Sequence, residues 1–284
     1  MTTSLALPRD LVGVTVGPIE HAIDARWLMA YAAGLGETDA RYFDTLATGG
    51  PASHPLFPVC YEWPALLAVR ARATPDEIAV RSVHATHDLA VHRPPRAGDS
   101  LHTTARVTGL AHRRAGTLLM VRLETTDADG RRVTTSDYGS VYRGVGFEGE
   151  DLGQGVDGSA GSGLPPGAVE MPVEVPAGLA HVYTECARIW NPIHTDVAVA
   201  RAAGLPDIIL HGTATLALAV SGILRHSGAD PRAVRRVRGH FTGMVSLPSR
   251  LTIRAAKAHE GQVFVFEAAE GGTRVLRGGM MEFA

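Results

Sequence analysis

The stretch IILHGTATLALAVSGIL, residues 208–224, is the most apolar window of the chain and the starting point for its fold. It is short for a membrane span and carries four polar side chains, His211, Thr213, Thr215 and Ser221. A run of this kind is typical of a helix buried inside a protein core. We therefore expect a central helix over residues 212–224 and no membrane span.

Hairpin patterns follow this helix and follow a second apolar stretch earlier in the chain. QVFVFEAAE (262–270) and TRVLRGGMMEF (273–283) flank a Gly-Gly turn. After PALLAVRARA (64–73), the runs TLLMVRLETTD (117–127) and RRVTTSDYGSVYR (131–143) flank an Ala-Asp-Gly turn in the same way. One apolar helix followed by antiparallel hairpins predicts an α+β fold in which a sheet wraps around a helix.

The two halves of the chain resemble each other. YAAGLGETDARYFD begins at Tyr31, YTECARIWNPIHTD begins at Tyr183, and the offset is 152 residues. Residues 91–110 align with 241–260 at an offset of 150. A repeat of this period indicates a duplicated domain. The Gly-, Ser- and Pro-rich segment 144–167 reads as a structureless linker, so we expect domains over 1–143 and 168–284.

Composition narrows the class of protein. The 284 residues carry a formal net charge of −2, which gives no basic field for nucleic acid or an anionic membrane. Cys60 and Cys186 are far apart and show no metal-ligand spacing, as in a reduced intracellular protein. The start, MTTSLALPRD, lacks the pattern of a signal peptide. We expect a cytoplasmic protein.

Three separated segments carry a family resemblance. The pattern Y…NPIH.D, then GLPDIILHGTATLALA, then HFTGMVSLPSRLTI resembles the MaoC-like (R)-specific enoyl-CoA hydratases and dehydratases, which have the hotdog fold. The resemblance implies a double hotdog with one continuous antiparallel sheet, a degenerate first half and a second half that carries the motif. It also implies a homodimer acting in fatty acid metabolism. The implied activity is that of an enoyl-thioester hydratase or 3-hydroxyacyl-thioester dehydratase, a lyase whose substrate is carried by coenzyme A or acyl carrier protein, with no metal or redox cofactor.

The family motif reads roughly Gly-Asp-x-Asn-Pro-x-His, with the Asp and the His acting together on the enoyl thioester. By this resemblance His194 falls on the catalytic histidine, and Asn191 and Pro192 fall on the conserved pair. The Gly falls on Arg188 and the Asp on Ile189, so the usual carboxylate is missing.

These matches give the candidate site. We expect His194 to transfer protons, because its ordinary pKa of roughly 6.5 suits either direction, and Asn191 to orient the loop or a water molecule. Gly212 follows His211 and opens the apolar helix, where a thioester carbonyl would meet free N–H groups and the positive end of the helix dipole. Close packing of Gly212 against the sheet is an equal alternative. The expected substrate-binding residues are Gly212, His211, Tyr183 and Ile189.

A replacement for the missing carboxylate is sought near the motif. Glu185 lies four residues before Ile189, and Glu37 falls on the position equivalent to Ile189 in the first half, with Tyr42 on that of His194. The segment SHPLFPVCYEWP (53–64) is a candidate pocket wall or a piece of core. Two other functions stay open: a single-histidine isomerase or intramolecular-addition enzyme, and a catalytically silent acyl-thioester-binding partner subunit.

Overall fold

The computed structural model describes residues 5–153, 163–258 and 262–284. Within them, one sheet of eleven strands has the order β1-β3-β4-β5-β2-β8-β11-β10-β9-β7, and β6 pairs with β3. All pairings in this sheet are antiparallel. The strands are β1 (Thr15–Ala22), β2 (Ser82–Val91), β3 (Ser100–Arg113), β4 (Gly116–Asp127), β5 (Arg132–Arg143), β6 (Leu152–Gly153), β7 (Val169–Val175), β8 (Val234–Phe241), β9 (Ser249–Lys257), β10 (Val263–Glu270) and β11 (Thr273–Phe283). The helices are α1 (Ala25–Gly34), α2 (Pro58–Ala73), α3 (Asp76–Ala79), α4 (Leu179–Ala187), α5 (Val197–Ala202) and α6 (Gly212–Ser227).

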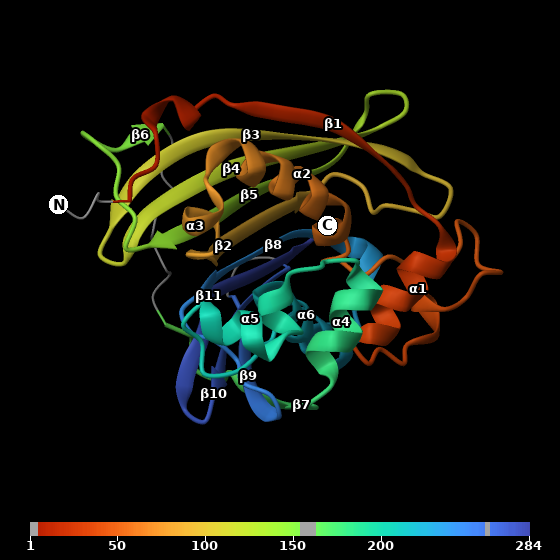
Figure 1. Ribbon diagram of the computed structural model, residues 1–284. Helices are drawn as coiled ribbons and strands as arrows, with labels where there is room; N and C mark the ends of the chain where they lie inside the picture. The colour runs from red at the N-terminus through yellow and green to blue at the C-terminus, as the bar shows by residue number, and fades with distance from the viewer. Residues whose placement is uncertain (1–4, 154–162, 259–261) are drawn as a thin grey trace.

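Each half of the sheet curves around one helix. In the first half α2 packs against β1, β3 and β4; in the second half α6 packs against β7, β9, β10 and β11 (Figure 1). Every α6 residue from Ala214 to Leu224 is buried, because the helix is apolar on nearly all sides. The predicted α+β double hotdog is confirmed.

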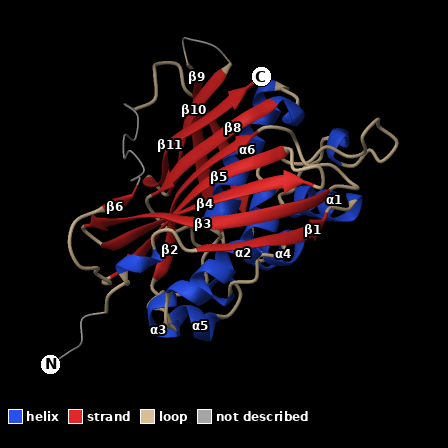
Figure 2. Cartoon of the chain, turned by 90° about the horizontal axis from the view of Figure 1, so that it is seen from above, coloured by secondary structure: helices blue, strands red, loops and turns tan. Residues whose placement is uncertain are grey.

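The two half-sheets join where β2 pairs with β8, over the register Thr86↔His240 to Ala90↔Arg236. The Arg236 guanidinium crosses this join and donates to the Asp88 carboxylate at 2.7 Å. The result is one continuous surface, as expected, with the central helices on its concave face (Figure 2). Within the described residues, no helix is both long and apolar enough to cross a bilayer.

The central helix of the first half begins earlier than expected. It starts at Pro58 rather than at residue 64, and it contains Pro64 in its interior. Proline is well tolerated in the first turn of a helix but disfavoured in its interior. From the sequence alone, Pro64 is therefore expected to begin the helix. Burial of Cys60 and Tyr61 against the core holds this first turn in helical form.

The duplication extends to local detail at the offset of 152. The short 3-10 helices Ala40–Tyr42 and Pro192–His194 are equivalent. Asp44 accepts from the backbone N–H groups two and three residues ahead of it, and Asp196 does the same. Equivalent segments thus fold by equivalent local contacts.

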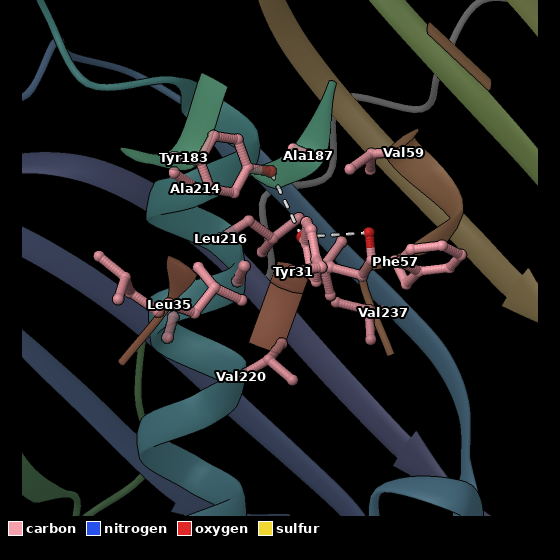
Figure 3. Close-up of a cluster of buried hydrophobic side chains, with 14 of the residues drawn as sticks. Tyr31, Leu35, Phe57, Val59, Tyr183, Ala187, Ala214, Leu216, Val220 and Val237 are labelled. Atoms are coloured by element: carbon pink, nitrogen blue, oxygen red, sulfur yellow. Dashed lines mark hydrogen bonds between the residues drawn. The ribbon is translucent and has the colours of Figure 1, made fainter. Parts of the chain in front are cut away.

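Helices α1 and α4, which precede these segments, pack against each other (Figure 1). Gly34 allows the close approach, because a Cβ at this position would lie 2.8 Å from the Cβ of Cys186. The hydroxyl groups of the equivalent residues Tyr31 and Tyr183 meet at 3.3 Å in the buried core (Figure 3).

The predicted linker contains structure in its first part. Val145 and Phe147 are buried against the first half-sheet, and Leu152–Gly153 form β6. The expectation of a structureless segment is therefore wrong for residues 144–153, where scattered apolar side chains bury themselves between the glycines. Residues 154–162 of that segment lie outside the described residues. The domain boundaries at 143 and 168 stay predictions.

Candidate active site

A cavity of about 160 Å³ lies between the two halves. Its second-half side is formed by the loops that precede α5 and α6, and we call five residues there the catalytic wall: Ile189, Asn191, His194, His211 and Gly212. Its first-half side is formed by α2, β2 and β5, and we call five residues there the polar wall: Glu62, His84, His87, Tyr138 and Ser140. Apolar side chains line the rest of the cavity, including Leu66, Val69, Leu119, Val121, Phe241 and Val275.

His194 ends the 3-10 helix Pro192–His194 and is 8% exposed. Its Nδ1 lies 2.8 Å from the carbonyl oxygen of Ile209. A carbonyl only accepts, so Nδ1 carries the hydrogen and Nε2 of the neutral ring is left as a proton acceptor. Burial lowers the pKa of His194 to about 4, against a smaller opposing effect of the Ile209 carbonyl. The ring is therefore neutral at pH 7.

His211 stacks on His194, with ring centroids 3.6 Å apart. Its Nε2 lies 3.2 Å from the Thr184 hydroxyl. This contact holds the His211 ring against the His194 ring. Burial lowers the pKa of His211 well below its usual value, and a charge on His194 would lower it further. The two stacked rings cannot readily both be charged, so a proton taken up by His194 is readily given away.

Gly212 is the first residue of α6 and lines the cavity. The first N–H groups of a helix have no partner within the helix, so this end of α6 offers donors to an oxyanion. A Cβ on Gly212 would lie 3.4 Å from the Phe241 ring, at the near limit of ordinary van der Waals contact. The role of Gly212 in binding a thioester carbonyl stays a prediction.

Ile189 is 4% exposed and lines the cavity. The residue before it, Arg188, has a φ of 58°, in the left-handed region, and ends α4. That backbone is one that favours glycine, the residue that the family motif places here. The Arg188 guanidinium lies 4.1 Å from the centre of the Trp27 ring of α1, a cation–π contact that offsets part of the strain.

Asn191 precedes the same 3-10 helix, and its carbonyl accepts from the His194 N–H at 3.1 Å. Asn191 is half-buried and lines the cavity. This backbone hydrogen bond ties Asn191 to His194, and both residues line the cavity.

Three residues do not lie where their expected roles require. Tyr183 is fully buried behind the cavity and donates to the Thr213 hydroxyl at 3.1 Å, so it supports a lining residue rather than binding substrate. Glu185 is exposed and accepts from Trp190 Nε1 at 3.5 Å. Glu37 is buried elsewhere and pairs with Arg225 of α6 at 3.2 Å. Among the described residues, neither glutamate lines the cavity, so both are wrong as replacement carboxylates.

The carboxylate that does line the cavity is Glu62, which is 1% exposed. Sequence reasoning missed it, although it falls within the segment 53–64 singled out as a candidate wall. A lone acidic residue inside an apolar helix was the available signal. His84 and His87 were missed as well, because a strand with several polar residues reads as a half-exposed one.

Residues 5–153, 163–258 and 262–284 contain no candidate metal site. No three His, Cys, Asp or Glu side chains gather there as a metal would need.

Comparisons with known proteins agree with this architecture. Residues 172–277 match the model of the MaoC like domain, and residues 10–136 match the FAS1-like dehydratase domain region. The second half of the chain is thus similar to the MaoC like domain, and the first half to the FAS1-like dehydratase region. Among curated relatives, enoyl-CoA hydratase ChsH3 of Mycobacterium tuberculosis is 25% identical over 270 residues, which cover 88% of this chain and 90% of that protein.

Two further matches set the limits of the likeness. The match to fatty acid synthase subunit beta of Aspergillus oryzae is 36% identical over 104 residues but spans only 5% of that protein. The crystal structure of a MaoC-like dehydratase from Phytophthora capsici superposes with a TM-score of 0.82 at 20% identity, over 96% of each chain. At that identity the superposition establishes the fold, and the reaction has to be argued from the cavity.

Proposed function

We propose that this chain interconverts trans-2-enoyl and 3-hydroxyacyl thioesters at the catalytic wall, with His194 as the one proton carrier. The observation that carries the proposal is the fixed, neutral His194. Its Nδ1 hydrogen is held by the Ile209 carbonyl and its Nε2 acceptor belongs to a ring that lines the cavity beside the start of α6.

The dehydration direction follows from that arrangement. His194 Nε2 takes the proton from the α-carbon, and the electron pair moves onto the thioester oxygen, held by the N–H groups at the start of α6. The protonated ring then gives its proton to the 3-hydroxyl group. The C–O bond breaks, the double bond forms and water leaves; hydration is the reverse. One base is enough if the hydrogen and the hydroxyl leave from the same side.

Two features predict a slow reaction. Ile189 neither holds water nor moves a proton, and losing one of two cooperating acid/base groups costs roughly 10²- to 10⁴-fold. The lowered pKa of His194, about 4, also makes it a weak base. We therefore propose weak turnover of short enoyl-CoAs. Ile189 also keeps the cavity dry beside His194, next to the carbons adjoining the thioester.

The direct test incubates the purified protein with crotonyl-CoA and longer trans-2-enoyl-CoAs. Loss of the conjugated thioester absorbance, with formation of 3-hydroxyacyl-CoA, supports the proposal. Acyl carrier protein thioesters, compared in the same assay, identify the carrier. Double-bond migration without water uptake would instead identify an isomerase.

The second candidate is a silent acyl-thioester-binding subunit, and the buried Ile189 is the observation that favours it. Tight binding of enoyl-CoA with no turnover in either direction would establish that alternative. A homodimer also stays a prediction, which the mass in solution tests.

A further inference from the structure

The polar wall holds a buried acidic group that the proposed reaction does not use. Glu62 belongs to α2, and its Oε1 accepts from the Ser136 hydroxyl at 2.5 Å. Burial raises the pKa of Glu62 to about 7, against a smaller lowering by the Ser136 hydroxyl. At neutral pH this group therefore either donates or accepts a hydrogen bond at little cost.

His87 stands on the same wall with its hydrogen bonding unmet. It is 2% exposed and lines the cavity, on the strand that joins the two halves. Within the described part of the chain, neither of its ring nitrogens has a hydrogen-bond partner. Burial lowers the pKa of His87 to about 4, so the neutral ring has one N–H donor and one acceptor. A buried polar atom without a protein partner calls for a water molecule or a ligand group to pair with it.

Strand register brings the two groups to the same place. In the pairing of β2 with β5, His87 is opposite Tyr138, and Leu89 is opposite Ser136, the partner of Glu62. His87 and Ser136 are thus diagonal neighbours on one face of the sheet, roughly 7–8 Å apart. One small polar group of a ligand between them is within reach of both.

Under the proposed function, the two walls would bind different parts of one ligand. The catalytic wall receives the thioester end, because the helix N-terminus and His194 are there. The acyl chain then extends across the cavity toward α2 and β2. We infer that the substrate's acyl chain carries a hydroxyl group, which His87 and Glu62 bind. This inference rests on the proposed function for the direction of the chain.

The preference for a hydroxyl group follows from the cost of leaving buried polar atoms without hydrogen-bond partners. Water can pair with His87 only until an acyl chain fills the cavity. A plain alkyl chain would displace that water and leave the ring nitrogens unpaired, which is costly in a buried site. A hydroxyl group accepts from the His87 N–H and donates to the Glu62 carboxylate, so it pairs a His87 nitrogen that an alkyl chain would leave without a partner. An acyl chain with a hydroxyl group is then preferred over the same chain without one.

The test compares trans-2-octenoyl-CoA with its derivatives hydroxylated at carbon six, seven or eight. For wild type we expect kcat/KM to be at least about 10-fold higher for the best hydroxylated substrate. In His87→Leu and in Glu62→Gln this preference falls to near one. His92→Leu is the matched control, because His92 is exposed, directly follows β2 and bonds to Thr135 instead of lining the cavity. It keeps the wild-type preference.

The other possible outcomes each decide for or against the inference. No preference in wild type overturns the inference, and so does a preference that survives both substitutions. A loss in Glu62→Gln that is equal for both substrates assigns Glu62 to the chemistry instead. If neither substrate turns over, calorimetry with the saturated thioesters separates the two proposals. If the hydroxylated thioester binds more tightly and this advantage is lost in both variants, the hydroxyl-binding site is supported and the hydratase proposal is rejected. If the two thioesters bind equally, both proposals are rejected. The conservative Glu62→Gln keeps the test open if His87→Leu does not fold.

Discussion

The loop after α1 and the loop after α4 are two copies of one structure that serve different purposes. At the offset of 152, Gly36 and Glu37 match Arg188 and Ile189, and Tyr42 matches His194. Gly36 has a φ of 73° and Arg188 a φ of 58°, so the backbone turns in the same way in both copies. The side chains differ: the first copy has the carboxylate without the histidine, and the second has the histidine without the carboxylate.

The surroundings of each copy explain the difference. Glu37 pairs with Arg225 of α6 in the second half. The Tyr42 ring lies 5.9 Å from the His54 ring, and His54 in turn contacts the Ser221 hydroxyl of α6, so the first copy packs toward the second half. Ile189 and His194 line the cavity instead. The turn shared by the two copies thus fixes where the side chains lie, and the contacts around each copy decide whether they face the cavity or pack in the core.

The largest expected effect separates Tyr42 from His194. His194→Gln should lower the hydration rate at least about 100-fold, because the proposed proton carrier is removed. Tyr42→Phe, at the equivalent position, should leave the rate unchanged. Steady-state kinetics with a melting curve for each variant checks this. A near-normal rate in His194→Gln, with a large loss in His211→Gln, would show that the wrong histidine of the stacked pair was chosen.

Acid should destabilise both halves through their buried histidines. Burial lowers the pKa of His54 to about 3 and those of His87 and His194 to about 4. The unfolded chain binds protons near pH 6.5 and the folded chain does not, so the free energy of unfolding falls as pH drops from about 6.5 toward 4. The slope is up to about 1.4 kcal/mol per pH unit for each histidine.

Denaturant unfolding at pH 7, 6 and 5 measures this loss. A free energy of unfolding that stays constant over that range would contradict the burial of these rings. Catalysis should respond differently, since kcat/KM should not fall around pH 6.5, where an exposed histidine would titrate.

Removing the Glu37–Arg225 ion pair of the first copy should lower the stability of the protein without changing its activity. Glu37→Gln removes the charge that faces Arg225 inside the protein and should lower the free energy of unfolding by about 1–2 kcal/mol, a value reduced because Arg225 is partly exposed. The rate of hydration should stay the same. Glu185→Gln, at an exposed carboxylate, is the control and should change neither. A fall in kcat for Glu37→Gln without unfolding would mean that the first copy takes part in catalysis.

The smallest effect concerns the turn itself. Gly36→Ala should cost about 1 kcal/mol, since a Cβ is disfavoured at this φ. Arg188→Gly relieves similar strain but loses the contact with Trp27, worth about 0.5–1 kcal/mol, so its net effect should be near zero. Melting temperatures of the two variants measured together test this. Strong destabilisation by Arg188→Gly would show that the cation–π contact outweighs the strain.

Much of this architecture follows from sequence patterns that depend on neighbours along the chain. The two hairpins, the helix from Gly212 and the repeat at 152 were all predictable, because alternation, turn residues and apolar runs are local signals. The position of His194 followed from its motif. Glu62 and His87 did not, since they meet only when α2 lies over β2 and the first half closes on the second. Glu37 and Glu185 were near Ile189 by alignment or in the chain, yet their side chains point to Arg225 and to solvent.

The most direct test is the rate of crotonyl-CoA hydration by Ile189→Asp beside wild type. We propose that the second copy has the geometry of the family site and lacks only its carboxylate. Ile189→Asp should therefore raise the rate, by roughly 10- to 100-fold, while binding of the thioester persists. A wild-type rate that is already high, together with no gain or a loss in Ile189→Asp, would show that another group supplies the second acid/base function and would contradict the account.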